Sequence, residues 1–149
     1  KPDTRNNTSI MIEDLFPTLL HMAQVNDYKV PQIVDGKDMV PLLKGKNESE
    51  FNKRSIIWNF PNIWGNTGPG INLNCAIRQG DWKLIYNYET GEKELYNIPQ
   101  DIGENNNLAH ANPSKVKELS SILGKKLRQM NAQRPVVKAT SKPCAWPDE

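Results

Sequence analysis

The sequence predicts an α+β fold: a small antiparallel sheet of about four strands packs against a long C-terminal helix, and helices precede the sheet. Apolar residues recur at helical spacing near the N-terminus and again after Pro113, whereas alternating aromatic-rich runs joined by short turns fill the middle. Eleven prolines and nine glycines in 149 residues favour short elements. With 37% hydrophobic residues and a mean hydropathy of −0.68, the core is thin, so we expect a larger partner surface.

Charge and hydropathy exclude two classes of partner. The 19 basic and 17 acidic residues are mixed along the chain and give a net charge of +2, so no basic stripe indicates nucleic acid. No run approaches the roughly 18 apolar residues of a membrane span. The opening residues KPDTRNN contain no apolar signal core, so we expect any export signal to lie upstream.

Residues 1–45 are expected to be helical. Residues Ile12 to Ala23 have one apolar face, and their first turn is acidic, as suits the start of a helix. That face comprises Leu15, Leu19, Met22 and Ala23. After a connector, a short helix is predicted from Met39 to Leu43, with Asp38 as its N-cap and Gly45 as its terminator.

Residues 46–53 form a polar linker, after which the pattern changes to that of strands. The predicted domain that follows covers residues 54–133. Its strands are rich in β-branched and aromatic residues or alternate in polarity, and most are joined by short turns, so antiparallel neighbours are expected. They run over Ser55–Phe60, Leu73–Arg78, Asp81–Tyr88 and Lys93–Asn97.

A long helix is predicted from Pro113, because proline suits the first helical position and Asn112 can cap it. Its apolar stripe continues to Met130, and the helix must end before Pro135. Residues 134–149 are predicted to be an irregular, proline-punctuated tail.

No catalytic constellation emerges from the sequence. His21 and His110 each lack a companion at metal-ligand spacing, and Ser9, Ser55 and Thr18 have no neighbouring base. Cys75 and Cys144 are too few for a metal framework. A disulfide between them stays open, but two free or buried thiols are the favoured interpretation.

One loop carries the candidate binding residues. Trp58, Asn59, Asn62 and Trp64 surround a proline and precede a glycine-rich stretch, and indole faces beside amides suit sugar rings. For Trp58 the alternative is a place in the core, and this is the interpretation that we favour. For Trp64 the alternative is that it seals the base of the loop, and the sequence favours neither this role nor sugar binding. Arg78 is a weaker candidate for an anion, since a strand arginine is more often solvated or structural.

Several segments, in this order, resemble the C-terminal part of the type I sulfatases. The helix IEDLFPTLLHMA, the stretch VDGKDMVPLLKG and the strand IWNFP match that family's Pro-Thr helix, Asp-Gly segment and Phe-Trp-His-Tyr-Pro strand. The segments AIRQGDWKLI and KELYNIPQDIGENNNLA and the closing helix complete the resemblance. Any one motif is weak, but the ordered set covers most of the chain.

The resemblance implies a sulfatase that hydrolyses sulfate esters, with a formylglycine nucleophile and a calcium ion in a catalytic domain outside this chain. Neither cysteine lies in the Cys/Ser-x-Pro-x-Arg context from which formylglycine forms, so the chain itself is expected to hold no cofactor, no metal and no catalytic residue. Many relatives have histidine at the position of Asn59. An amide can hydrogen-bond a hydroxyl but cannot shuttle protons near neutral pH, so the usual substrate contact is altered here.

We therefore interpret residues 1–45 as the end of an α/β sulfatase catalytic domain and residues 54–133 as the accessory subdomain. The expected partners are that catalytic domain and a sulfated glycan, and the exposed apolar helix face favours self-association of the isolated chain. A periplasmic or secreted location follows from the family. Two alternatives remain: a free-standing carbohydrate-binding or interaction module, and a fragment of a related phosphatase or phosphonate hydrolase.

Overall fold

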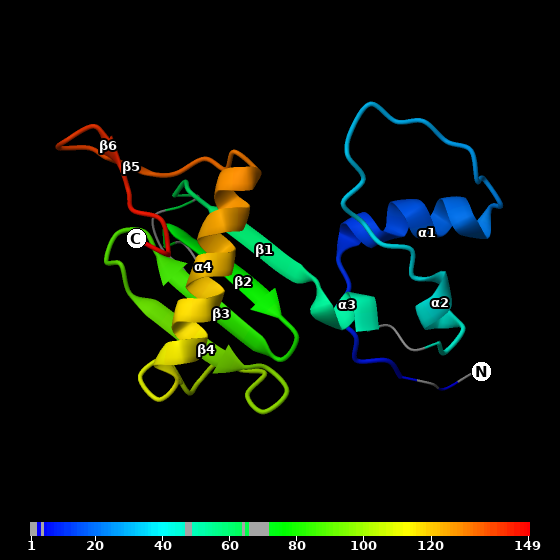
Figure 1. The fold of residues 1–149 in the computed structure, drawn as a ribbon, viewed down its shortest axis with the longest axis horizontal. Coiled ribbons are helices and arrows are strands. Elements are labelled where there is room, and N and C mark those ends of the chain that lie inside the picture. The colour runs from blue at the N-terminus through cyan, green and yellow to red at the C-terminus, as the bar shows by residue number, and fades with distance from the viewer. Residues whose placement is uncertain (1–2, 4, 47–48, 64, 66–71) are drawn as a thin grey trace. The chain divides into compact units, whose positions relative to one another are not determined.

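A computed structural model describes the whole chain except residues 1–2, 4, 47–48, 64 and 66–71, and it divides into two compact units, Lys1–Arg54 and Ser55–Glu149 (Figure 1). The first unit is built from helices and connecting segments, and the second contains a sheet and a long helix. In the described part of the chain, no helix is both long and apolar enough to cross a membrane.

The helices of the first unit lie close to where the sequence places them. The 3₁₀ turn η1 (Ile12–Asp14) runs into α1 (Leu15–Met22), and a second helix, α2, covers Val40–Leu43. The N-cap of α2 is Met39 and not Asp38 as predicted, although Asp38 Oδ1 still accepts the Val40 N–H at 2.9 Å. Gly45 ends α2 at a φ of +72°, a conformation that glycine adopts without steric cost.

A third helix, α3 (Ser49–Lys53), occupies the end of the segment that the sequence assigns to a polar linker. The reason is Phe51, which is buried against Met39 and Leu42 in a small apolar cluster. One aromatic side chain anchors this otherwise polar stretch, so residues 49–53 of the predicted linker are helical.

The second unit begins with a four-stranded antiparallel sheet, as the sequence predicts, and the strand order is β1-β2-β3-β4. The strands are β1 (Ser55–Phe60), β2 (Asn74–Gln79), β3 (Trp82–Asn87) and β4 (Lys93–Asn97). Tight turns join the last three strands, and their glycines, Gly80 and Gly91, have φ values of +58° and +73°. Successive hairpins of this kind produce the simple meander.

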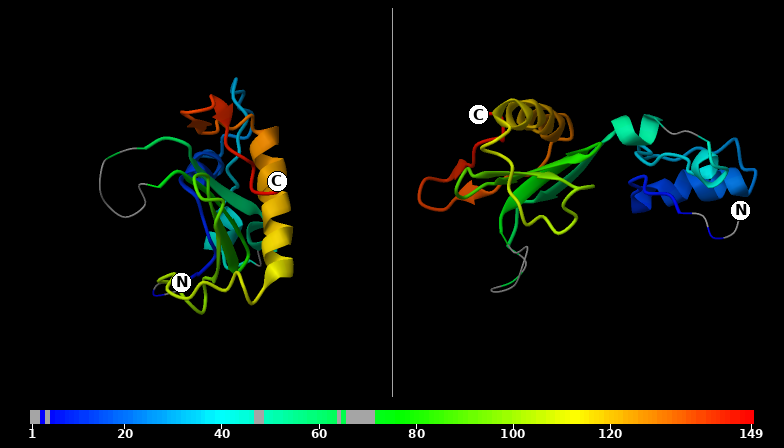
Figure 2. Two further views of the ribbon diagram at one scale, coloured as in Figure 1. Left: turned by 90° about the vertical axis from the view of Figure 1, so that its left-hand side faces the viewer. Right: turned by 90° about the horizontal axis from the view of Figure 1, so that it is seen from below.

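The long helix α4 (Pro113–Gln129) lies across one face of the sheet, which gives the predicted two-layer architecture (Figure 2). Its inner stripe meets the apolar side chains of β2, β3 and β4 in one core. The fully buried members of this core are Cys75, Ile77, Leu84, Leu95, Leu119, Leu123 and Leu127. Asn112 occupies the N-cap position, but its side chain donates to Leu108 O at 3.1 Å and makes no capping bond, so that detail of the prediction is wrong.

The tail is more ordered than the irregular segment that the sequence predicts. It forms a hairpin of β5 (Val136–Val137) and β6 (Lys142–Pro143), and then inserts Cys144 and Trp146 into the core. The guanidinium carbons of Arg134 and Arg128 lie 4.3 and 5.4 Å from the centroid of the Trp146 indole. The tail therefore belongs to the folded unit, because its tryptophan supplies apolar area that the thin core needs.

Both cysteines are buried free thiols, which agrees with the favoured interpretation. They belong to the same apolar core, although Cys75 comes from β2 and Cys144 from the tail.

Candidate functional site

The residues predicted to contact substrate do not converge on one point. In the sheet register, Asn59 lies opposite Cys75, and Arg78 lies opposite Ile56. Because side chains alternate along a strand, Asn59 shares the α4-covered face with Cys75, while Arg78 lies on the other face. Asn62 is exposed beyond the end of β1, and Trp64 lies outside the described residues. The assignment of these four residues to substrate stays a prediction.

Asn59 already has partners at both ends of its amide. Its Nδ2 donates to Gln133 O at 2.9 Å, and its Oδ1 accepts the Tyr88 hydroxyl at 2.9 Å. Burial, together with the neighbouring Cys75 thiol, raises the pKa of Tyr88, so the phenol stays protonated and donates. In this structure Asn59 connects β1, the end of β3 and the segment after α4.

Arg78 and Trp58 lie on the face of the sheet opposite α4. Arg78 Nε donates to Gly80 O at 3.3 Å, which holds the side chain along its own hairpin turn. Lys83 Nζ lies 5.9 Å from the centroid of the Trp58 ring and also bonds the Glu104 carboxylate at 2.6 and 2.9 Å. Trp58 is half-buried under this cation, which supports its structural interpretation.

The motifs of the first unit hold its fold together. Asp14 is fully buried and accepts four hydrogen bonds: one each from the Met11 and Lys37 amides and two from Arg54. Burial opposes its ionisation, yet these bonds and the Arg54 charge outweigh that effect and lower the pKa of Asp14. A carboxylate with this many donors is a structural anchor.

Thr18 of the Pro-Thr helix and Gly36 of the Asp-Gly segment each have a structural role. The Met39 N–H donates to Thr18 Oγ1 at 2.8 Å, and Thr18 Oγ1 donates to Asp14 O at 2.6 Å, so the hydroxyl joins α1 to the start of α2. At Gly36, a Cβ atom would lie 2.0 Å from Glu13 O. Only glycine allows this close approach of two backbones.

One face of α1 is left uncovered by the described residues of its unit. The exposed fractions of Leu15, Phe16, Leu19 and Met22 are 45%, 44%, 59% and 62%. Phe16 also borders an apolar hollow of about 400 Å³ with Val30 and Ile33. A contiguous apolar surface of this kind marks an interaction face. The sequence identified the stripe but missed Phe16 and the hollow, because the connector after α1 has no periodicity.

The described residues include no group of three or more metal-ligating side chains placed to hold an ion. His21 is paired with Asp38 at the surface of the first unit. His110 lies in the second unit, before α4.

The sheet and helix define the class: an α+β unit preceded by helices with an uncovered apolar face. The family model for N-sulphoglucosamine sulphohydrolase, C-terminal, matches residues 1–133. The chain belongs to this family of sulfatase C-terminal segments.

Individual relatives agree with this assignment. A protein named sulfatase from Formosa agariphila is 31% identical over 136 residues, which cover 85% of this chain and 24% of the relative. Arylsulfatase K from Xenopus laevis is 28% identical, covering 87% of this chain and 23% of the relative. The chain thus spans about a quarter of the length of these curated relatives.

A solved structure shows the same fold. The structure of BT4656 in complex with its substrate D-glucosamine-2-N,6-O-disulfate is 26% identical with a TM-score of 0.61. The match covers 79% of this chain and 24% of that chain.

Proposed function

We propose that this chain is the C-terminal segment of a sulfuric ester hydrolase that acts on sulfated carbohydrate. The observation that carries the proposal is the family match over residues 1–133, which extends across both compact units. The disulfated glucosamine bound by one structural relative supports a carbohydrate substrate. On this proposal, residues 1–45 end the catalytic domain, residues 46–53 are the linker, and residues 54–133 form the accessory subdomain.

The chemistry resides in the catalytic domain. There, a formylglycine and a calcium ion would supply the nucleophile and its electrostatic support, and this chain would complete the fold and shape the substrate pocket. The uncovered face of α1, with Leu15, Leu19 and Met22 exposed, is the surface offered to that domain. A periplasmic or secreted location fits sulfated glycans, which are extracellular polymers.

The substrate contacts remain those predicted from the sequence. Asn62 is exposed just beyond β1 and is free to meet a sugar hydroxyl, and Trp64 would supply an aromatic platform. Asn59 would act by fixing the end of β1, since both ends of its amide are bonded within the unit. Arg78 would meet an anionic group on the face of the sheet opposite α4.

The proposal is tested on the full-length protein. It should hydrolyse a small aryl sulfate and a sulfated oligosaccharide, whereas this chain alone should hydrolyse neither. The Trp64→Ala variant should raise KM for the oligosaccharide about tenfold, as expected for one stacking platform, and should change aryl sulfate hydrolysis much less. Equal loss on both substrates would assign Trp64 a structural role. Absence of sulfatase activity in the folded full-length protein, or turnover by this chain alone, would contradict the proposal.

A further inference from the structure

Positive charge is concentrated in the last quarter of the chain. Residues 113–149 contain eight basic and three acidic residues, which give a net charge of +5. Residues 1–112 contain eleven basic and fourteen acidic residues, which give a net charge of −3. The near-neutral total of +2 hides this separation. The basic part consists of α4 and the tail with its hairpin of β5 and β6.

The three acids of this part already have partners. Arg128 bonds Asp148 at 2.8 Å and Glu149 at 3.1 Å. Lys115 bonds Glu118 at 2.6 Å. The excess positive charge of residues 113–149 therefore lies on the remaining basic side chains.

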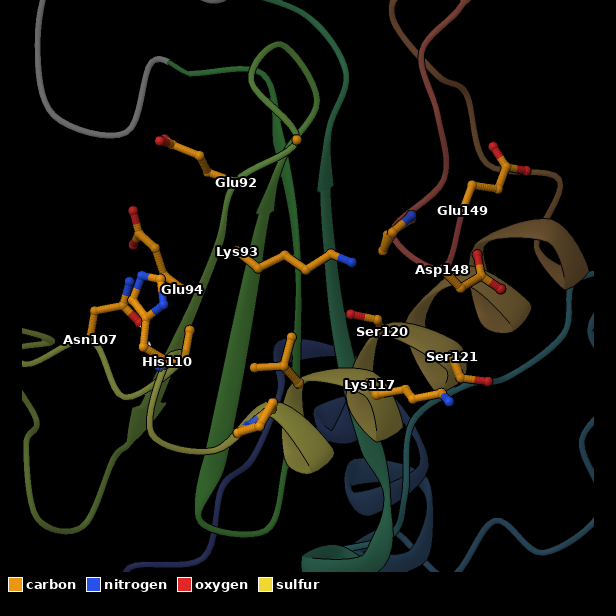
Figure 3. Close-up of a pocket in the computed structure, with 15 residues that line it drawn as sticks. Glu92, Lys93, Glu94, Asn107, His110, Lys117, Ser120, Ser121, Asp148 and Glu149 are labelled. Carbon is orange, nitrogen blue, oxygen red and sulfur yellow. Dashed lines mark hydrogen bonds between the residues drawn. The ribbon is translucent and has the colours of Figure 1, made fainter.

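Four exposed lysines form a surface that we call the basic end. Lys125 and Lys126 lie in the second half of α4, Lys138 follows β5, and Lys142 begins β6. Their ammonium groups make no ion pair or hydrogen bond with any residue that the structure describes. Lys117 is a further exposed cation of α4, but it borders a groove of about 870 Å³ that four carboxylates line, so it is not included (Figure 3).

The hairpin is fixed to the rest of the second unit at its base. Arg134 Nη1 donates to Cys144 O at 2.8 Å, and the Cys144 N–H donates to Pro135 O at 2.9 Å. Trp146 then enters the core. In Figure 1 and in the left view of Figure 2, the hairpin lies at the same end of the unit as the C-terminal end of α4. The four lysines therefore belong to one end of a folded unit.

The helix dipole explains only part of this arrangement. A cation in the last turn of a helix is stabilised by the negative end of the dipole, and Lys126 and Arg128 lie in the last turn of α4. Lys138 and Lys142 lie outside the helix, so the dipole does not explain them. Like charges at one end of a unit repel one another, so an anionic partner would relieve this repulsion as well as add contacts.

We propose that the basic end binds the sulfate groups of a sulfated glycan chain. The identity of this ligand rests on the proposed function, in which such a chain is the substrate. An exposed ion pair contributes little free energy, so a single sulfate on one lysine binds weakly. A chain that carries sulfates along its length meets several lysines, and each contact after the first is an intramolecular one.

Two other polyanions fit the basic end less well. A helix that lies on a membrane presents an apolar face to the lipid, whereas Ser121, Lys125 and Gln129 make the outer face of α4 polar. Proteins that bind single-stranded nucleic acid combine cations with exposed aromatic rings. The one aromatic residue in 113–149 is Trp146, and it is buried in the core. Charge without an exposed apolar or aromatic platform favours the sulfated glycan.

Binding is measured on the 149-residue chain with heparin, a heavily sulfated glycan, by isothermal titration. Affinity for long heparin chains should fall about 50-fold between about 50 and 200 mM salt, by analogy with four phosphate contacts of a nucleic acid. The amide resonances of residues 125–126 and 138–142 should shift, and those of the first unit should not. Desulfated heparin and a heparin disaccharide should each bind at least about tenfold more weakly, because they lack the charge or the length.

Charge-removing variants divide the basic end into its two elements. Lys125→Gln with Lys126→Gln should weaken heparin binding about fivefold, and so should Lys138→Gln with Lys142→Gln. Combining all four substitutions should weaken binding about 25-fold, since the two pairs lie on separate elements. These side chains are exposed and have no partner among the described residues, so the amide spectrum of each variant should stay native.

A matched control removes two charges elsewhere. Lys29→Gln with Lys46→Gln replaces exposed lysines of the first unit and should change heparin affinity less than about twofold. Equal loss in this control would show that heparin responds to net charge alone and would overturn the proposal. A four-lysine variant that binds like the wild type would overturn it as well.

The remaining arms decide the class of ligand. Desulfated heparin that binds as tightly as heparin would contradict recognition of sulfate. Duplex DNA or vesicles of anionic lipid that bind the basic end more tightly than heparin would make it a nucleic-acid or membrane surface and overturn the proposal. These measurements need no turnover, so a failure of binding is distinct from a failure of the proposed sulfatase activity, which is assayed by hydrolysis.

Discussion

The guanidinium of Arg54 donates two hydrogen bonds to the buried Asp14 carboxylate, at 2.7 Å from Nη1 to Oδ1 and 2.6 Å from Nη2 to Oδ2. Arg54 is the last residue of the first unit and Asp14 is the N-cap of α1, so the pair ties the end of the unit to the start of that helix. The same guanidinium also bonds Ser9 O at 3.0 Å. The bidentate geometry gives a directional, charge-assisted contact inside a unit whose apolar cluster is small.

Breaking this pair should cost much more than breaking a surface pair. Asp14→Asn leaves the Arg54 charge without its counterion, so we expect a loss of about 3–5 kcal/mol in the free energy of unfolding of the first unit. Urea denaturation, monitored through the exchange of the Met11 and Lys37 amide protons, measures this loss. As a control, Lys115→Ala breaks the exposed Lys115–Glu118 pair and should cost less than about 0.5 kcal/mol. Equal effects from both variants would contradict the structural role of Asp14.

The same carboxylate should make the first unit acid-sensitive. Its pKa is lowered from 3.8, because the hydrogen bonds and the Arg54 charge outweigh the opposing effect of burial. A lowered folded-state pKa contributes stability that is fully present above the unfolded value and is lost as pH falls through the folded one. We therefore expect protection of the Met11 and Lys37 amides to be constant from pH 7 to 5 and to fall below about pH 4. The decline should be absent in Asp14→Asn.

Much of the second unit could be predicted from sequence because its signals are local. Alternation in Trp82–Asn87 and the turn glycines determine the hairpins, and the stripe after Pro113 determines α4. The connection between Asn59, Tyr88 and Gln133 could not be predicted, because it joins segments that only the folded sheet brings together. A residue chosen for a polar role in recognition was therefore found bonded within the fold.

Sequence patterns failed where one residue decides the structure. Phe51 converts a polar linker into α3, and Trp146 draws an irregular tail into the core. The groove of about 870 Å³ between β4 and the first half of α4 was missed for a related reason. Its polar groups come from a strand edge, a helix and the tail, and Ser120 in the sequence resembles any exposed helical serine.

Gly124 should be essential for the docking of the tail onto α4. A Cβ atom there would lie 2.0 Å from Asp148 Oδ1, and Asp148 cannot move away without losing its bond to Arg128. Gly124→Ala should therefore destabilise the second unit by about 1–3 kcal/mol despite the higher helix propensity of alanine. Faster proteolysis after residue 134, together with a lower midpoint of urea unfolding, would show this destabilisation. Ser121→Ala, three residues earlier on α4, is the control, and a stabilised Gly124→Ala variant would contradict the argument.

Cys75 should be chemically inert in the folded chain. Burial raises the pKa of its thiol to about 11, and the thiolate is the reactive form. At pH 8 we expect Cys75 to react with iodoacetamide only after unfolding, with a rate that follows the opening of the sheet. Peptide mapping of the alkylated protein with and without urea measures this. Rapid native-state modification of Cys75 would show that the core is open at β2.

The contributions of Asn59 and Tyr88 to the free energy of unfolding should depend on each other. Asn59→Ala removes the acceptor that Asn59 gives the buried Tyr88 hydroxyl and the donor that it gives the Gln133 carbonyl, so we expect a loss of about 1–3 kcal/mol. Asn59→Asp keeps an acceptor for Tyr88 but removes the donor to Gln133, and should fall between the wild type and Asn59→Ala. A double-mutant cycle with Tyr88→Phe should give a coupling free energy of about 0.5–2 kcal/mol in urea denaturation. Additive effects would mean that the two side chains do not depend on each other. In that case the Asn59 amide would be free to serve the substrate contact predicted from the sequence.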